Sequence, residues 1–277
     1  QCSIERRGRM KLLRFFLDEQ GRICLGEPAG PGLARPLISA PGDPAVFAPH
    51  PVTVQTYLPP VEPPNIFAIG RNYREHVAET GARLPEAPLI FEKPTTALTG
   101  HETDIVLPEA APNEVDFEAE LAIVIGRVAR RVPREKALDH VFGYTCANDV
   151  SARDCQRLDR QWTRAKGFDT FCPLGPWLVT ADELQPDRLA IRSRLNGQPM
   201  QESSTSRMIF SCADLISYLS HQFTLVPNTV ILTGTPEGVG FARRPPVFLR
   251  AGDRIEVEIE GIGTLSNVVR GSGAITA

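Results

Sequence analysis

Short runs of β-branched or alternating apolar residues, each bounded by Gly, Pro or Asn, recur through most of the sequence and favour a fold built from strands. The expected strands are residues 65–70, 118–126, 141–148, 189–195, 229–233 and 253–260. Helical patterns are few: residues 134–140 form a weak one, and residues 211–223 begin with a capping-box-like Ser211 and Asp214. An apolar stripe at helical spacing follows in that second segment, formed by Leu215, Tyr218, Leu219 and Phe223. The sequence therefore predicts an α+β fold that is predominantly β.

A proline-rich stretch at residues 58–64 divides the chain, because proline can continue neither a helix nor a central strand. Before it, turn signals at residues 18–21 and 41–44 separate short strand-like runs. Residues 10–62 are therefore expected to form a small β-rich N-terminal domain and its linker, and residues 63–277 the main domain. Residues 1–9, which precede Met10, are interpreted as a leader or an expression remnant and do not enter the fold argument.

Charge and apolar content exclude several classes of protein. With 30 Lys and Arg against 33 Asp and Glu, the formal net charge is −3, which gives no electrostatic case for binding nucleic acid or an anionic membrane. The longest apolar runs fall far short of the roughly 20 residues that cross a bilayer, and the polar N-terminal stretch has no apolar signal core. The six cysteines include no CxxC pair. The expectation is a cytoplasmic protein with reduced thiols that acts on a small molecule.

Three carboxylates occur at the ends of two apolar strand patterns. Glu118 and Glu120 are two residues apart, so a strand places both on one face. Asp149 follows the apolar run at 141–148 and could complete a site of hard oxygen ligands, which Mg²⁺, Mn²⁺ or Ca²⁺ prefer. The alternatives are a solvated strand face for the two glutamates and a turn or N-cap position for Asp149.

A short helix is predicted where Asn72 can serve as N-cap and Gly81 follows the last turn. His76 and Glu79 lie three residues apart in it and therefore on one face. The carboxylate can then orient the imidazole and stabilise its charged form when it takes a proton. An exposed surface pair is the alternative interpretation.

Two further segments have the composition of ligand-binding elements. Lys166 lies among aromatic and small residues and not in a charge run, which is consistent with a partly buried ammonium facing an anion; a surface lysine with a buried stem is the alternative. Residues 233–240, Thr-Gly-Thr-Pro-Glu-Gly-Val-Gly, follow a Val-Ile-Leu strand and are rich enough in glycine for the backbone to approach a ligand closely. Alone, that segment would be a tight turn.

Taken together and in this order, these motifs resemble the fumarylacetoacetate hydrolase family. The resemblance rests on Gly-Arg-Asn-Tyr at 70–73, Glu-x-Glu at 118–120, Asn-Asp-Val-Ser-Ala-Arg-Asp at 148–154, Lys166 and Thr-Gly-Thr-Pro at 233–236. It covers residues 65–269, and the N-terminal part looks like the small β domain of many bacterial members. The chain departs from the family's commonest wording at Glu92, where an apolar residue is usual, and at Gly167, where Ser is frequent.

The resemblance implies a mixed β-sandwich roll, a homodimer, and Mg²⁺ or Mn²⁺ held by Glu118, Glu120 and Asp149, with Ca²⁺ as a substitute in crystals. It also implies that the helix bearing His76 and Glu79 is a mobile lid whose pair activates water, beside a catalytic Lys166. Contacts to the 2-oxo carboxylate end of the substrate are implied for Arg153, Gln156, Lys166 and Thr235, and less directly for Arg71 and Tyr73. If Glu92 faces the site, it disfavours a second carboxylate on the substrate.

The function implied is metal-dependent hydrolysis of a carbon–carbon bond in an acylpyruvate, in which the divalent ion stabilises the pyruvate enolate. The same site could serve an oxaloacetate decarboxylase or a hydroxymuconate-type or hydroxyheptadienedioate isomerase. A non-catalytic, metal-stabilised β module is the alternative from another class, and the joint presence of His76, Glu79 and Lys166 with the carboxylates argues against it. No Gly-x-Ser-x-Gly sequence occurs that would indicate a nucleophilic hydrolase.

Overall fold

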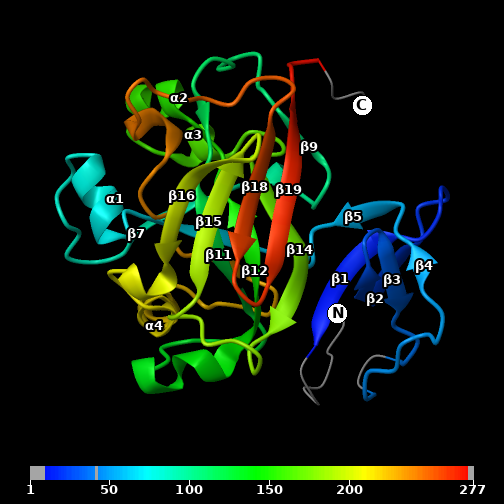
Figure 1. Ribbon diagram of the computed structural model, residues 1–277. Helices are drawn as coiled ribbons and strands as arrows, with labels where there is room; N and C mark the ends of the chain where they lie inside the picture. Colours follow the sequence, from blue (N-terminus) through cyan, green and yellow to red (C-terminus); the bar gives the residue numbers. More distant parts are fainter. Residues whose placement is uncertain (1–9, 41–42, 274–277) are drawn as a thin grey trace.

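Strands dominate the structure, a computed structural model that describes residues 10–40 and 43–273 (Figure 1). A large sheet runs in the order β4 (Val52–Thr53), β3 (Leu33–Pro36), β2 (Ile23–Gly30), β1 (Lys11–Phe16), β14 (Cys172–Thr180), β12 (Val141–Asn148), β11 (Ala119–Ile125), β17 (Val230–Leu232), β6 (Ile66–Gly70) and β7 (Leu89–Glu92), with β5 (Thr56–Leu58) paired to β1 and β8 (Leu98–Thr99) to β14. A second sheet has the order β16 (Gln198–Ser204), β15 (Ala190–Leu195), β18 (Arg254–Ile259), β19 (Gly263–Arg270) and β9 (Asp104–Val106). A short pair, β10 (Val115–Asp116) and β13 (Ser151–Ala152), lies beside them.

The two larger sheets pack face to face through strands β11, β12 and β14 on one side and β15, β18 and β19 on the other. Side chains from both inner faces form one core, which includes Leu121, Ile123, Ile191 and Val257. Strand β11 is buried along its whole length, since it has neighbours on both edges and cover on both faces. The fold is thus the predominantly β, mixed sandwich that the sequence predicts.

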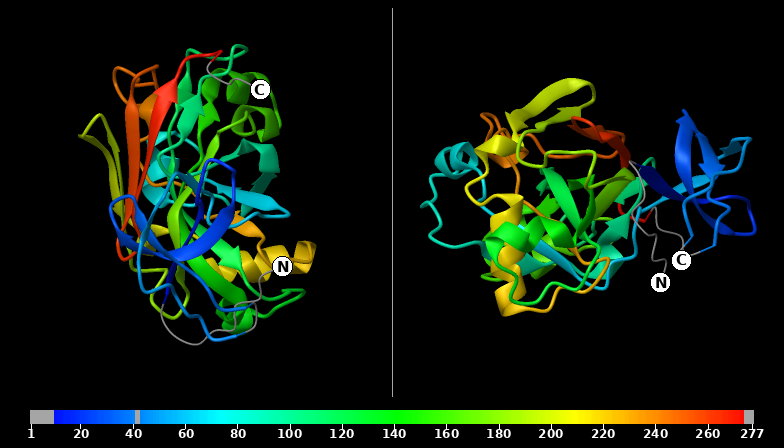
Figure 2. Two further views of the ribbon diagram at one scale, coloured as in Figure 1. Left: turned by 90° about the vertical axis from the view of Figure 1, so that its right-hand side faces the viewer. Right: turned by 90° about the horizontal axis from the view of Figure 1, so that it is seen from below.

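The N-terminal strands form a unit at one side of the molecule, away from helix α1 (Arg74–Glu79), as the views in Figures 1 and 2 agree. Strand β1 belongs to both parts: Lys11 and Leu12 pair with β14, whereas the following residues pair with β2 and β5. The expected hairpin turn at 18–21 joins β1 to β2. The boundary expected near Glu62 falls between β5 and β6, and the division into two domains stays a prediction.

All six expected strands are present, with ends shifted by no more than a residue or so. Strands β14, β16 and β19 were not expected. β14 has the sequence Cys-Pro-Leu-Gly-Pro-Trp-Leu-Val-Thr, whose prolines and glycine signal a break, yet it pairs with β12 and β1 because its register shifts around these residues. Such pairing depends on distant partners and is not readable from local composition.

The predicted helix at 211–223 is α4 (Cys212–Gln222), and its capping box between Ser211 and Asp214 is confirmed. The segment Arg134–His140 is a 3₁₀ helix and not an α-helix, following Pro133. Two short helices, α2 (Arg153–Leu158) and α3 (Thr163–Lys166), were not expected. Among the described residues, no helix is long and apolar enough to span a bilayer. Residues 1–9 and part of the loop expected at 41–44 lie outside the described residues.

Candidate metal and proton-transfer site

The buried ionisable side chains of the described residues gather in one place. Those with a basic or carboxyl group are His76, Lys93, Asp116, Glu118, Glu120, Asp149, Arg153 and Lys166, each less than a tenth exposed. Ion pairs and electrostatic effects on pKa link them all into one cluster. Burying a charge is costly unless the charge is paired, so a protein concentrates such groups where function needs them. This cluster is therefore the candidate functional site.

Adjacent strands bring the three predicted carboxylates together. Ala119 of β11 pairs with Asn148 of β12, so Glu118 lies beside Asp149, whose backbone N–H donates to the Glu118 carbonyl at 2.9 Å. Glu120 lies two residues farther along β11. One carboxylate oxygen from each of these three residues lies within 4.8 Å of the others. The geometry matches the sequence prediction of a shared oxygen-ligand site.

Lysine ammonium groups bind the same carboxylates. Lys166 Nζ lies 2.8 Å from Glu118 Oε2 and 2.6 Å from Asp149 Oδ2. Lys93 Nζ lies 2.6 Å from Asp149 Oδ1 and also donates to the carbonyl of Lys166. These contacts bury two ammonium groups, which is tolerated because each faces an anion.

Arg153 joins the cluster from the start of helix α2. Its Nη2 lies 2.7 Å from Glu118 Oε1, and its Nε donates to Asp116 Oδ2 at 2.9 Å. Gln156, one turn farther along α2, accepts a hydrogen bond from Arg153 Nη1 at 2.9 Å. The guanidinium is thereby fixed between Asp116, Glu118 and Gln156.

The cluster carries one more negative group than positive. Four buried carboxylates (Asp116, Glu118, Glu120 and Asp149) face three cationic side chains (Lys93, Arg153 and Lys166). Burial alone would raise the pKa of Glu118, but Lys166, Arg153 and His76 lower it to about 2. Burial and the charges of Asp149 and Glu118 instead raise the pKa of Glu120 well above its usual value. A set of hard oxygen donors with surplus negative charge fits a divalent cation such as Mg²⁺ or Mn²⁺.

The His76–Glu79 pair forms as predicted on helix α1. Nδ1 of His76 lies 2.8 Å from Glu79 Oε1, and the imidazole is 7% exposed. The other oxygen, Glu79 Oε2, accepts a hydrogen bond of 2.9 Å from the backbone N–H of Gly238. The charge of His76 is one of the causes of the low pKa of Glu118, after those of Lys166 and Arg153. The pair is therefore a partly covered unit and not an exposed surface pair.

The prediction that Asn72 caps helix α1 is wrong. Tyr73 occupies the N-cap position, with no side-chain cap. The buried Asn72 amide donates instead to the carbonyls of Phe210 (3.0 Å) and Thr233 (2.7 Å) and accepts from the Phe210 N–H at 2.8 Å. Three distant backbone groups that would otherwise be unsatisfied in the interior outcompete the local cap. Asn72 thus ties the start of α1 to the end of β17.

The other expected contact residues are placed differently. Tyr73 is fully buried, its hydroxyl has no hydrogen-bond partner in the described part of the chain, and burial together with the Glu120 charge raises its pKa well above the usual value. Thr235 Oγ1 donates to the Ala119 carbonyl at 3.0 Å and accepts from Gln201 Nε2 at 2.7 Å. Arg71 is exposed, with its guanidinium 5.9 Å from the centre of the Trp162 ring, and is not part of the cluster.

Sequence reasoning missed Lys93, Asp116 and Gln201. The signal for Lys93 was the segment Phe91-Glu-Lys-Pro94, since alternation along the strand puts Phe91 and Lys93 on one face and Glu92 on the other. The Phe91 ring lies 5.3 Å from Lys166 Nζ, whereas Glu92 is exposed. Glu92 therefore does not face the site, and the condition under which it would disfavour a second carboxylate is not met.

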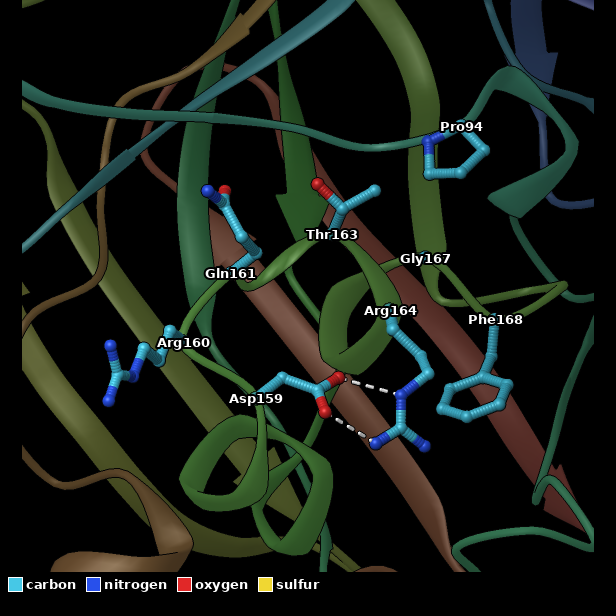
Figure 3. A pocket seen from close by; sticks show the side chains of 8 residues that line it. All are labelled: Pro94, Asp159, Arg160, Gln161, Thr163, Arg164, Gly167 and Phe168. Carbon is cyan, nitrogen blue, oxygen red and sulfur yellow. Dashed lines mark hydrogen bonds and ion pairs between the residues drawn. The ribbon is translucent and has the colours of Figure 1, made fainter.

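Figure 3 shows an open depression of about 580 Å³ lined by Pro94, Asp159, Arg160, Gln161, Thr163, Arg164, Gly167 and Phe168. Two of these residues, Pro94 and Gly167, directly follow Lys93 and Lys166 in the chain, but none of the three clustered carboxylates lines the depression. Arg164 donates to Asp159 there at 2.6 and 2.7 Å. A Cβ at Gly167 would clash with the Thr163 carbonyl oxygen and lie 2.6 Å from Pro94 Cδ, so a serine at this position would require its neighbours to shift.

Asn72→Asp should lower the free energy of unfolding by about 1–3 kcal/mol, because the carboxylate can still accept from Phe210 N–H but cannot donate to the two carbonyls. Chemical denaturation would measure this. Asn65→Asp is the matched control, since the Asn65 side chain is only partly buried and makes no hydrogen bond among the described residues. Equal stability of the two variants would show that Asn72 is not the cross-link described.

Glu120→Gln should raise the thermal midpoint of the metal-free protein, because burial and the charges of Asp149 and Glu118 make Glu120 harder to ionise in the folded chain than in the unfolded one, and Gln has no such cost. Mn²⁺ should raise the midpoint of the wild type, since binding at a hundredfold excess over Kd adds about 2.7 kcal/mol to the free energy of unfolding, and should raise that of this variant much less. Glu92→Gln, at an exposed position, should behave as wild type in both measurements. A Mn²⁺-induced shift that is the same in all three proteins would contradict the assigned cation site.

Known enzymes are similar to this chain in sequence and in structure. A mitochondrial oxaloacetate tautomerase of Xenopus laevis is 48% identical over 219 residues, 78% of this chain and 68% of that protein. The solved 2-hydroxyhepta-2,4-diene-1,7-dioate isomerase from Mycobacterium marinum is 40% identical, with a TM-score of 0.81 over 95% of this chain and 99% of its own. Fumarylpyruvate hydrolase from Pseudomonas aeruginosa, solved with Mn²⁺ and pyruvate, is 32% identical, with a TM-score of 0.70 over 79% and 93%. These relatives are enzymes that differ in the reaction named for them.

The family model described as fumarylacetoacetate (FAA) hydrolase C-terminal matches residues 65–270, which is most of the chain and contains the whole buried cluster. The chain belongs to the fumarylacetoacetate hydrolase family.

Proposed function

We propose that this protein is a divalent-metal-dependent enzyme that interconverts the keto and enol forms of a small 2-oxo acid of the oxaloacetate type. The observation that carries the proposal is the His76–Glu79 pair, in which Nδ1 and Oε1 lie 2.8 Å apart, in the same site as three carboxylates that fit a divalent cation. Tautomerisation needs one group that takes a proton from carbon and returns it to oxygen, and this pair can do so without a further residue. The 48% identity to an oxaloacetate tautomerase supports the same reaction.

The cation would be held by Glu118, Glu120 and Asp149 and would supply positive charge where the 2-oxo acid end of the substrate binds. Lys166 is suited to contact the substrate carboxylate: two of its three N–H donors face Glu118 and Asp149, which leaves the third for a ligand. Arg153 has most of its donors committed to Asp116, Glu118 and Gln156, so we assign it to holding Glu118 in place. With these groups fixed, the substrate has one orientation.

Glu79 determines which imidazole nitrogen is the base. Its carboxylate accepts a hydrogen bond from Nδ1–H of His76, which leaves the lone pair on Nε2. Nε2 can then remove the proton next to the 2-oxo group, and Glu79 stabilises the imidazolium that forms. The same nitrogen returns the proton to the enol oxygen or to carbon in the reverse direction. The pair is therefore a proton carrier in both directions.

Two proposed contacts depend on rearrangement or on an unsatisfied atom. The Thr235 hydroxyl donates to the Ala119 carbonyl, so it can donate to a substrate carboxylate only after that bond breaks. The Tyr73 hydroxyl is buried and has no hydrogen-bond partner among the described residues, so it can donate to a bound ligand or water without breaking an existing bond. Of these two, Tyr73 is the better candidate to contact the substrate.

Hydrolysis of an acylpyruvate, the reaction expected from the sequence, is the second candidate. The same His76 nitrogen could remove a proton from a water molecule, and the solved fumarylpyruvate hydrolase supports this alternative at 32% identity. Hydrolysis also requires a place for the water and for the distal acyl group. Oxaloacetate decarboxylation differs from both, because it does not require the His76 base.

His76→Asn and Glu79→Gln should each lower kcat for enol-to-keto conversion of oxaloacetate, by about 10²–10⁴-fold for His76 and less for Glu79, because the base is lost or misoriented. The loss of the enol ultraviolet absorbance measures the rate, with a blank of Mn²⁺ without enzyme. Arg74→Gln, an exposed change on the same helix, is the control and should retain wild-type kcat.

The same proteins, with Mn²⁺ or EDTA, would be given acetylpyruvate while pyruvate release is measured. Pyruvate release that requires both Mn²⁺ and His76, while His76→Asn leaves the rate of oxaloacetate tautomerisation unchanged, would replace the first candidate by the second. Oxaloacetate decarboxylation that survives in His76→Asn would indicate a lyase. Metal binding without turnover of any of these substrates would favour a non-catalytic module.

A further inference from the structure

One loop links three parts of the site. In residues 233–241, here called the anchor loop, backbone N–H groups donate to three different carboxylates. Gly234 donates to Glu120 Oε2 at 2.7 Å, Gly238 to Glu79 Oε2 at 2.9 Å, and Gly240 to Asp116 Oδ1 at 2.8 Å. The loop therefore bonds to the candidate cation ligand Glu120, to Glu79 of the His76–Glu79 pair, and to Asp116, which holds Arg153.

Glycine is required in this loop for physical reasons. Gly234 has a φ of +96°, and a Cβ there would lie 2.7 Å from Cβ of Asn72. Gly238 has a φ of +97°. Only glycine adopts such angles without strain, so the glycines let the backbone N–H groups turn toward the carboxylates. They do not by themselves fix where the loop lies.

Gln201 of β16 fixes the middle of the anchor loop. Its Nε2 donates to Thr235 Oγ1 at 2.7 Å and to the Pro236 carbonyl at 2.9 Å. Its Oε1 accepts from the Ala119 N–H at 3.0 Å and from Ser193 Oγ at 2.9 Å. Both donors and both acceptor positions of the amide are thus used, and the side chain is 1% exposed. A flipped amide would set its NH₂ group against the Ala119 N–H and its oxygen against the Pro236 carbonyl, so the orientation is determined by its partners.

We propose that Gln201 is a positioning residue that holds the distal half of the anchor loop, and through it the Glu79 carboxylate, in register with the Glu118–Glu120 segment. Ala119 lies between the two glutamates, and Pro236 lies two residues before Gly238. A chain of hydrogen bonds and backbone therefore connects the carboxylate site to the His76–Glu79 pair. It runs from Ala119 through the Gln201 amide to Pro236, and then along the loop to Gly238 and Glu79. Among the described residues, Gln201 forms no hydrogen bond or ion pair with His76 or with the three clustered carboxylates.

The path has a specific consequence for catalysis, which rests on the proposed role of the dyad. Without the Gln201 bonds, Thr235 and Pro236 lose their hydrogen bonds to β16, and the Gly238 N–H that orients the Glu79 carboxylate is held less firmly, although Thr235 keeps its bond to the Ala119 carbonyl. Glu118 and Asp149 keep their places, because the β11–β12 ladder and the Lys166 ammonium hold them. Loss of Gln201 should therefore impair proton transfer far more than cation binding.

The test compares Gln201→Met, which keeps the length of the side chain but removes its hydrogen bonds, with Ser193→Ala, which removes only the Ser193 bond to Oε1. In Gln201→Met, kcat should fall about 10- to 100-fold, while the Kd for Mn²⁺ changes less than about threefold. Amide hydrogen exchange should become faster in residues 237–241 and stay unchanged in 120–125, whose N–H groups do not bond to Gln201. Ser193→Ala should match the wild type in all three measurements. If Gln201→Met does not fold, Gln201→Glu replaces it, since Glu keeps the acceptor oxygen but cannot donate to the Pro236 carbonyl when ionised.

Unchanged kcat, or a parallel loss of kcat and Mn²⁺ affinity, would overturn the proposal. The exchange measurement separates this result from a failure of the proposed function. If the wild type turns over none of the substrates, faster exchange at residues 237–241 in Gln201→Met still supports the link between Gln201 and the anchor loop. Unchanged exchange at those residues would overturn it whatever the activity.

Discussion

The pairing of strand β11 with β12 is the constraint on which the site depends. Its register places Glu118 beside Asp149 and puts Glu120 next on the same strand, all in a buried layer. Once three carboxylates are fixed at such distances, their mutual repulsion must be offset, and the protein does so with buried ammonium and guanidinium groups and with a raised pKa at Glu120. A divalent cation bound there would offset the repulsion that disfavours the ionised form of Glu120, and this makes the cluster suited to such an ion.

Segments far apart in the sequence hold the His76–Glu79 pair in place. Asn72 fixes the start of the short helix α1 to the end of β17, and Gly238 fixes Glu79 from the anchor loop. A six-residue helix has little stability of its own, so these tertiary hydrogen bonds determine where His76 lies.

The sequence predicted the features that depend on local periodicity and failed where distant partners decide. The i, i+2 spacing of Glu118 and Glu120 and the i, i+3 spacing of His76 and Glu79 both survive in the structure, because strand and helix geometry alone set them. Asn72 was misassigned because its three partners come from residues more than a hundred positions away. Strand β14 and the buried Lys93 were missed for the same reason: proline and lysine signal surface or loop unless their tertiary partners are known.

Anomalous diffraction from crystals grown with Mn²⁺ tests the central claim most directly, because it locates the ion independently of any activity. We expect one manganese ion per chain, bound by carboxylate oxygens of Glu118, Glu120 and Asp149, and no manganese peak at this place in Glu118→Gln crystals. A manganese peak elsewhere would contradict the assigned cation site. So would the absence of any peak while Lys166 alone bridges Glu118 and Asp149.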